Sequence, residues 1–211
     1  MEILALKGLV LGFIYSVALV AGTVWCVQVT LRSGFLAGIY VAAALALAQG
    51  TLGGLATLAL YGLLMLPVDA SFALRLMAIL VFLYMSFKMF TAPKAKTLQS
   101  DVAKEEPRKL FSMTFALSVT MPMRLGGYLS FAIASGLPHH GISGVSVPFV
   151  ALAVCLGSSV WFVYIVILAR IFGHRVSESI SLISINKLNG LSGVVFLLVA
   201  LITAIPLLVE I

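Results

Sequence analysis

Charged side chains are scarce in this sequence. They make up 9% of its 211 residues, whereas about a quarter of a typical soluble domain is charged. Hydrophobic residues make up 62% and occur in long runs that do not alternate with polar residues. The basic residues behind the net charge of +6 cluster between these runs, which is a feature of membrane topology and predicts no nucleic-acid partner. The composition predicts an all-α, polytopic membrane protein.

Cysteines and catalytic motifs are also rare. Cys26 and Cys155 both fall in apolar runs and lack the spacing of a disulfide framework or metal site. The sequence has no phosphate-binding loop, no His-Glu-x-x-His motif and no convincing Ser/His/Asp arrangement. His139 and His140 are adjacent in an expected outer loop, but a metal site usually needs three or four ligands. We therefore expect no enzyme activity, no metal and no cofactor.

Acidic residues are absent from the interior of every apolar run. Proton relays in transporters are usually built from carboxylates within the membrane. This absence argues against simple proton coupling through a carboxylate, and it leaves coupling through other groups open.

Six apolar runs are long enough to cross a hydrocarbon core about 30 Å thick. They lie at 4–31, 36–64, 72–91, 110–136, 145–170 and 188–208. The first is too long for a cleavable signal and has no clean cleavage site, so we interpret it as a span. The polar segment 92–109 is expected to connect a first half, 1–91, to a second half, 110–211. Three spans in each half would give the halves opposite orientations, as in an inverted repeat.

The basic residues also predict the orientation. Most of them lie in the turn at 32–35 and the loops at 88–109 and 170–187, whereas Lys7 and Arg75 fall on the other side. Cytoplasmic loops carry the excess of lysine and arginine. Both termini are therefore expected outside the cytoplasm of a bacterial inner membrane. The pattern over 171–187 additionally predicts an amphipathic helix at the cytoplasmic surface.

One charge, Arg124, falls near the middle of a predicted span. An arginine at that depth costs roughly 2.5–3.5 kcal/mol on insertion scales, so it should face the protein interior or water. Pro122 removes a backbone donor and breaks the helix beside it. These features predict a binding site. The competing interpretation is a packing kink whose arginine reaches the headgroups or binds nearby carbonyl groups.

Gln49 is a polar residue near the middle of the second span, where it needs a hydrogen-bond partner. It is either a link between helices or part of a cavity wall, and the sequence favours neither. Other hydroxyl-bearing residues could complete the wall. The candidate substrate-binding residues are Arg124, Gln49, Ser118, Thr120, Pro122, Ser16 and Thr23.

Several short motifs occur in a characteristic order. They are Gly12-Phe13 with Thr30-Leu31, Gly34 and Ala37-Gly38; Met121-Pro122; and Asn186-Lys187 with Gly190. In this order and spacing the chain resembles the LysE-type amino-acid exporters, six-span inner-membrane proteins of similar length. In that family the second motif reads Asn-Pro and the third reads Asn-Arg-x-x-Gly. The resemblance covers nearly the whole chain and implies the family's fold and a transport function.

The departures from the family concern the residues expected to shape the pathway. The family's first span usually contains a Pro-x-Gly-Pro break, whereas this chain has Ala18-Leu19-Val20-Ala21. We therefore predict an unbroken helix from Leu4 to Leu31, which only Gly22 or tertiary packing could interrupt. The family also often has an acidic residue at the position of Gln49.

Two functions follow from the sequence. The first is alternating-access export of a small metabolite, an amino acid or a related carboxylate, with Arg124 holding the carboxylate. The alternative is a membrane scaffold or accessory subunit that keeps the fold without transport. The expected partners are the lipid bilayer and a small-molecule substrate. The sequence leaves open whether the protein forms a homo-oligomer or binds a partner subunit in the membrane.

Overall fold

The computed structural model describes residues 2–18, 20–64, 71–91, 106–120, 122–134, 144–172, 190, 193–194 and 196–205. The regular structure within these ranges is entirely helical, which confirms the all-α class. The helices are α1 (Glu2–Ala18), α2 (Val20–Ser33), α3 (Phe35–Leu64), α4 (Ser71–Phe90), α5 (Pro107–Val119), α6 (Pro122–Ala134), α7 (Ser146–Phe172) and a C-terminal helix, Phe196–Ile205. The histidine pair and nearly all of the amphipathic segment 171–187 lie outside the described residues, as does most of the connector.

Two helices are long and apolar enough to cross a membrane, counted over the described ranges alone. They lie at Phe35–Gly62 and Ser146–Phe172, within α3 and α7. A third span results if α1 and α2 are counted together as one bent pair. The fourth predicted span is divided between α5 and α6, and the described apolar helices of the third and sixth are shorter, at Leu76–Phe90 and Phe196–Ile205. The protein is thus a helical membrane protein.

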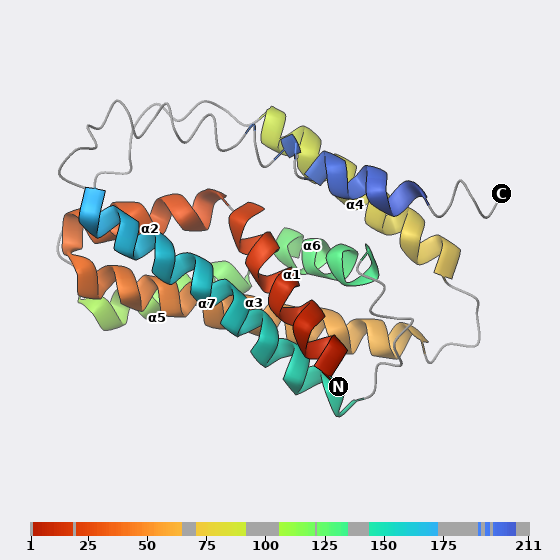
Figure 1. Cartoon of the computed structure of the whole chain (residues 1–211), viewed down its shortest axis with the longest axis horizontal. Coiled ribbons are helices and arrows are strands. Elements are labelled where there is room, and N and C mark those ends of the chain that lie inside the picture. Colours follow the sequence, from red (N-terminus) through yellow and green to blue (C-terminus); the bar gives the residue numbers. More distant parts are fainter. Residues whose placement is uncertain are drawn as a thin grey trace.

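The helices form a bundle in which α7 lies against both α1 and α3 (Figure 1). α3 also packs against α2, α5 and α6. α4 contacts α6 and runs beside the C-terminal helix along one edge of the bundle (Figure 1). This edge is joined by a hydrogen bond of 2.9 Å from the Ser86 hydroxyl to the Gly193 carbonyl and by stacking of Phe82 on Phe196. Helices far apart in sequence therefore pack together, both along this edge and around α3.

The crossing of α1 and α7 depends on glycines. A Cβ atom added to Gly12 would collide with the carbonyl group of Val154, and one added to Gly157 would collide with the carbonyl oxygen of Leu9. Glycines allow helix backbones to approach this closely in a membrane protein. The close crossing holds the carbonyl of Gly12 against α7.

The prediction of an unbroken first helix is wrong. α1 ends at Ala18, α2 begins at Val20, and the two helices are bent by 72° relative to each other. Neither proline nor glycine occupies 18–21, so the break falls to Gly22 or to tertiary packing. Tyr15 and Ala18 of α1 belong to one hydrophobic core cluster, whereas Cys26 and Val29 of α2 belong to another. The two parts of the span therefore point toward different cores.

The fourth span is broken where the proline predicted it. α5 ends at Val119 and α6 begins at Pro122, whose fixed φ and missing N–H suit the first position of a helix. The tight turn between α2 and α3 instead depends on Gly34, which has a φ of 92°. A residue without a Cβ atom adopts that left-handed conformation at little cost.

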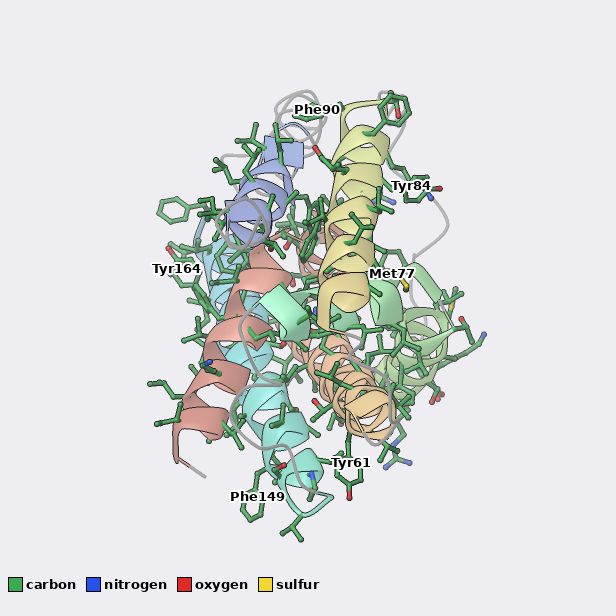
Figure 2. The ribbon with its side chains drawn as sticks, turned by 90° about the vertical axis from the view of Figure 1, so that its right-hand side faces the viewer. Tyr61, Met77, Tyr84, Phe90, Phe149 and Tyr164 are labelled. Carbon is green, nitrogen blue, oxygen red and sulfur yellow. The ribbon has the colours of Figure 1, made fainter. Side chains whose placement is uncertain are left out.

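The outer surface of the bundle is apolar. Tyr84 and Tyr164 project away from the helices, and each is more than half exposed (Figure 2). Phe149 lies at the opposite end of the bundle from Phe90 (Figure 2). In a membrane protein these side chains face lipid, so the polar groups of the interior stand out.

Candidate functional site

Gln49 of α3 is the centre of a buried polar group. Its side chain has no exposed surface. The hydroxyl oxygens of Ser16, Tyr128 and Ser158 lie 2.8, 2.6 and 2.7 Å from its Oε1 atom. The three hydroxyls come from α1, α6 and α7, so one amide oxygen joins four helices. We call these four residues the Gln49 hub.

The protons of the hub can be assigned by counting. A carbonyl oxygen has two lone pairs, and the Ser16 hydroxyl has a second acceptor, the Gly12 carbonyl, at 2.7 Å. The Ser158 hydroxyl also reaches this carbonyl, at 3.2 Å. Tyr128 therefore donates to Oε1, and the Ser16 and Ser158 hydroxyls share the remaining lone pair of Oε1 and the Gly12 carbonyl between them. Turning the amide around would leave the Tyr128 proton facing an NH₂ group that accepts nothing. The orientation with Oε1 at the hub is the one that places all three hydroxyl protons.

This orientation leaves the amide nitrogen without a partner. Gln49 Nε2 is buried and makes no hydrogen bond to any residue that the structure describes. A buried polar group that is left unsatisfied costs about 1–3 kcal/mol. The carbonyl oxygen of Gln49 is therefore fully used as an acceptor, whereas the N–H groups of the same amide donate to no described residue.

Arg124 lies in the first turn of α6 and is 8% exposed. Its Nη1 atom is also buried without a hydrogen-bond partner among the described residues. Its backbone carbonyl accepts a hydrogen bond of 3.2 Å from the Tyr15 hydroxyl. The predicted burial of Arg124 is confirmed.

Two buried tyrosines connect Arg124 to the hub. The rings of Tyr15 and Tyr128 are 4.2 Å apart between centroids and inclined at 49°. Tyr15 approaches the backbone of Gly127 so closely that a Cβ atom there would lie 3.0 Å from two of its ring carbons. Arg124 and Tyr128 are four residues apart on one helix and therefore share a face. Arg124 therefore lies one helical turn from Tyr128, the member of the hub that α6 contributes.

The structure brings together only part of the predicted site. Ser16 and Gln49 are hydrogen-bonded, and Arg124 lies one helical turn from the hub. Ser118 is buried on α5, and the buried hydroxyl of Thr23 accepts a bond of 3.1 Å from the indole N–H of Trp161.

Thr120 is exposed and donates to the carbonyl of Ala116 at 2.9 Å, so the structure does not turn its hydroxyl to the hub. Pro122 begins α6. Its contribution is the helix break.

Three residues of the site were missed by sequence reasoning: Tyr15, Tyr128 and Ser158. Tyr128 carried a usable signal, because it follows Arg124 by four positions in a predicted helix. Ser158 and Tyr15 carried none, since their place depends on how α7 and α1 cross α3.

The apolar exterior, the broken helices and the buried charge together define a membrane protein with a polar site inside its helical bundle. This is the class to which solute translocators belong. The particular family is identified by sequence: the profile of the LysE type translocator family matches residues 13–206. The chain belongs to the LysE family, as its motifs predicted. No curated protein and no solved structure gives a significant match.

Proposed function

We propose that this protein is an inner-membrane exporter of a small metabolite, an amino acid or a related carboxylate, that works by alternating access. Membership of a translocator family supports this proposal. The observation that carries it is the meeting of two broken helices at a buried polar group. Tyr15, before the break in the first span, donates a hydrogen bond to the backbone carbonyl of Arg124, after the break in the fourth span. Broken helices of transporters surround their substrate sites in this way.

We further propose six spans, arranged as two inverted halves at 1–91 and 110–211, with both termini outside the cytoplasm. The breaks support this arrangement because each falls in the first span of its half. Interrupted helices in corresponding positions of two halves are typical of repeat-built transporters. The basic residues of the predicted cytoplasmic loops support the orientation.

Arg124 is the proposed anchor for the substrate carboxylate. A guanidinium binds a carboxylate through two parallel, charge-assisted hydrogen bonds, and Nη1 has a free donor. Gln49 and Ser16 would form the adjoining wall. Ser118 and Thr23 remain candidates for a further part of the pathway, and Pro122 with Thr120 would shape the break.

A transport assay with purified protein in liposomes tests the proposal. Arg124→Lys should impair efflux of labelled amino acids and carboxylates more than folding, because a point charge cannot replace the planar fork. Arg124→Leu should abolish efflux while the protein stays inserted. Arg170→Leu, at the exposed end of α7, is the matched control and should retain transport. Full transport by Arg124→Leu would contradict the assignment.

The second candidate function is a membrane scaffold or accessory subunit without transport. The observation that favours it is that Gln49 is completely buried and that hydroxyl groups of three other helices contact its side chain. Such an interior is packed closed around Gln49. Wild-type protein that inserts and folds but neither binds nor moves any tested solute would support this function. Isolation from the membrane as a complex with another subunit would add to it.

A further inference from the structure

We propose that the site between Arg124 and Gln49 binds a small monovalent carboxylate, and that the protein exchanges one such anion for another across the membrane. The inference rests on the exporter function above and names both its substrate class and its mode of operation. It follows from unused hydrogen-bond donors, from the charge of the site and from burial.

The hydrogen-bonding groups around the site are unbalanced. Arg124 Nη1 and Gln49 Nε2 are both buried donors without partners among the described residues. Tyr128 links the two residues, because its hydroxyl donates to Oε1 of Gln49 and it follows Arg124 by one helical turn on the same face of α6. The acceptors at the hub are already used by hydroxyl protons. A ligand that fits must bring acceptors and few donors, and an ionised carboxylate is acceptor-only.

The charge of the site determines the charge of the ligand. Arg124 is the one charge that falls near the middle of a predicted span, and the sequence places no acid in a span interior. One monovalent anion therefore neutralises the site. A zwitterion would leave its positive charge uncompensated, and its ammonium group would find no carboxylate partner. A dicarboxylate would leave an excess negative charge.

The same burial predicts exchange. An empty carrier must change conformation with an unpaired guanidinium in its interior, whereas the loaded carrier moves a neutral pair. An unpaired ion in a low-dielectric interior is strongly disfavoured. The cost of a central charge on insertion scales corresponds to a difference in rate of roughly a hundredfold. The loaded form should therefore reorient much faster than the empty form.

Pyruvate is the probe for the experiment, because it is a small monocarboxylate that is ionised at neutral pH. Purified full-length protein is reconstituted into liposomes, and uptake of radiolabelled pyruvate is compared with and without unlabelled pyruvate inside. We expect internal pyruvate to stimulate uptake by at least about tenfold. Internal alanine, a zwitterion, and internal succinate, a dianion, should not stimulate it. An imposed membrane potential should not change the exchange rate, because the loaded site is neutral.

Gln49→Glu is the decisive variant. A carboxylate there can keep the hydroxyl bonds of the hub, and it introduces a negative charge beside Arg124. The variant should therefore fold, as judged by its elution and melting temperature, and lose pyruvate binding by at least about tenfold. Arg124→Gln should lose binding as well, whereas Arg170→Gln should behave as the wild type. Binding is measured as the shift in melting temperature with pyruvate.

The outcomes separate the inference from the exporter proposal. Equal uptake into empty and pyruvate-loaded liposomes refutes exchange and leaves the exporter intact. Trans-stimulation by alanine instead of pyruvate refutes the monocarboxylate and also leaves the exporter intact. Stabilisation by pyruvate that survives in Gln49→Glu refutes the site. Absence of both binding and flux for pyruvate refutes the inference, and the exporter proposal then fails only if the amino-acid and carboxylate efflux assay above is negative too.

Discussion

Gly157→Ala should destabilise the protein at the crossing of α1 and α7. The added methyl group would collide with the carbonyl oxygen of Leu9 and would lie 2.9 Å from the Leu9 carbonyl carbon and 3.0 Å from the Phe13 nitrogen. All three atoms belong to the backbone of α1, so a change of side-chain rotamer cannot relieve the clash. α1 must move away from α7.

The magnitude follows from two contributions. Overpacking a tightly packed interior costs about 1–3 kcal/mol. Moving α1 also stretches the contact between Ser158 and the Gly12 carbonyl and the one between Ser16 and Gln49, and a lost hydrogen bond costs about 0.5–1.5 kcal/mol. The total of roughly 2–4 kcal/mol corresponds to a fall in melting temperature of roughly 5–15 °C for a chain of this size.

The assay is thermal unfolding in detergent, followed by circular dichroism at a fixed heating rate because membrane proteins often unfold irreversibly. Gly62→Ala is the control. Gly62 is also in a helix, but a Cβ atom there meets nothing within 4 Å, so its melting temperature should not fall. If Gly157→Ala and Gly62→Ala melt at the same temperature, the crossing is looser than the structure shows and the argument fails.

Two further predictions concern the hub and the topology. Tyr128→Phe removes one donor from Gln49 Oε1 and should lower stability by about 0.5–1.5 kcal/mol, whereas Tyr164→Phe on the exposed face should change the melting temperature little; equal effects would contradict the hub. A single cysteine at Ser100 in a protein without its native cysteines should resist an impermeant maleimide in intact cells, and one at Gly141 should react. Labelling at position 100 from outside would overturn the orientation.

Local signals in the sequence were sufficient to predict that Arg124 is buried and that one helix is broken at Pro122. Arg124 could be placed in the interior from its cost in lipid alone, and Pro122 identified the break because its chemistry acts on adjacent residues. Gln49 likewise needed a partner because it is polar at mid-span. Each of these predictions used the properties of one residue and its depth in the membrane.

The composition of the hub could not be predicted in the same way. Ser16, Tyr128 and Ser158 are separated from Gln49 by 33, 79 and 109 positions in sequence. Ser16 and Ser158 are brought together because α1 and α7 approach closely at Gly12 and Gly157. Those glycines are visible in the sequence, but which helix each one faces is a property of the packed bundle. The sequence thus indicated that Gln49 has partners without indicating which ones.

The break in the first span shows why a missing motif is weak grounds for a straight helix. No residue from Ala18 to Ala21 disfavours helix in the way that proline does, so local propensity predicts continuity. The bend nevertheless forms beside Gly22, and it separates Tyr15, which packs with Tyr128 in one core, from Cys26, which packs in another. Tertiary contacts outweigh a propensity difference of a few tenths of a kcal/mol per residue. The chain therefore has a break in the first span of both predicted halves, one at Pro122 and one where no proline occurs, and Tyr15 before the first break donates to the backbone carbonyl of Arg124 after the second.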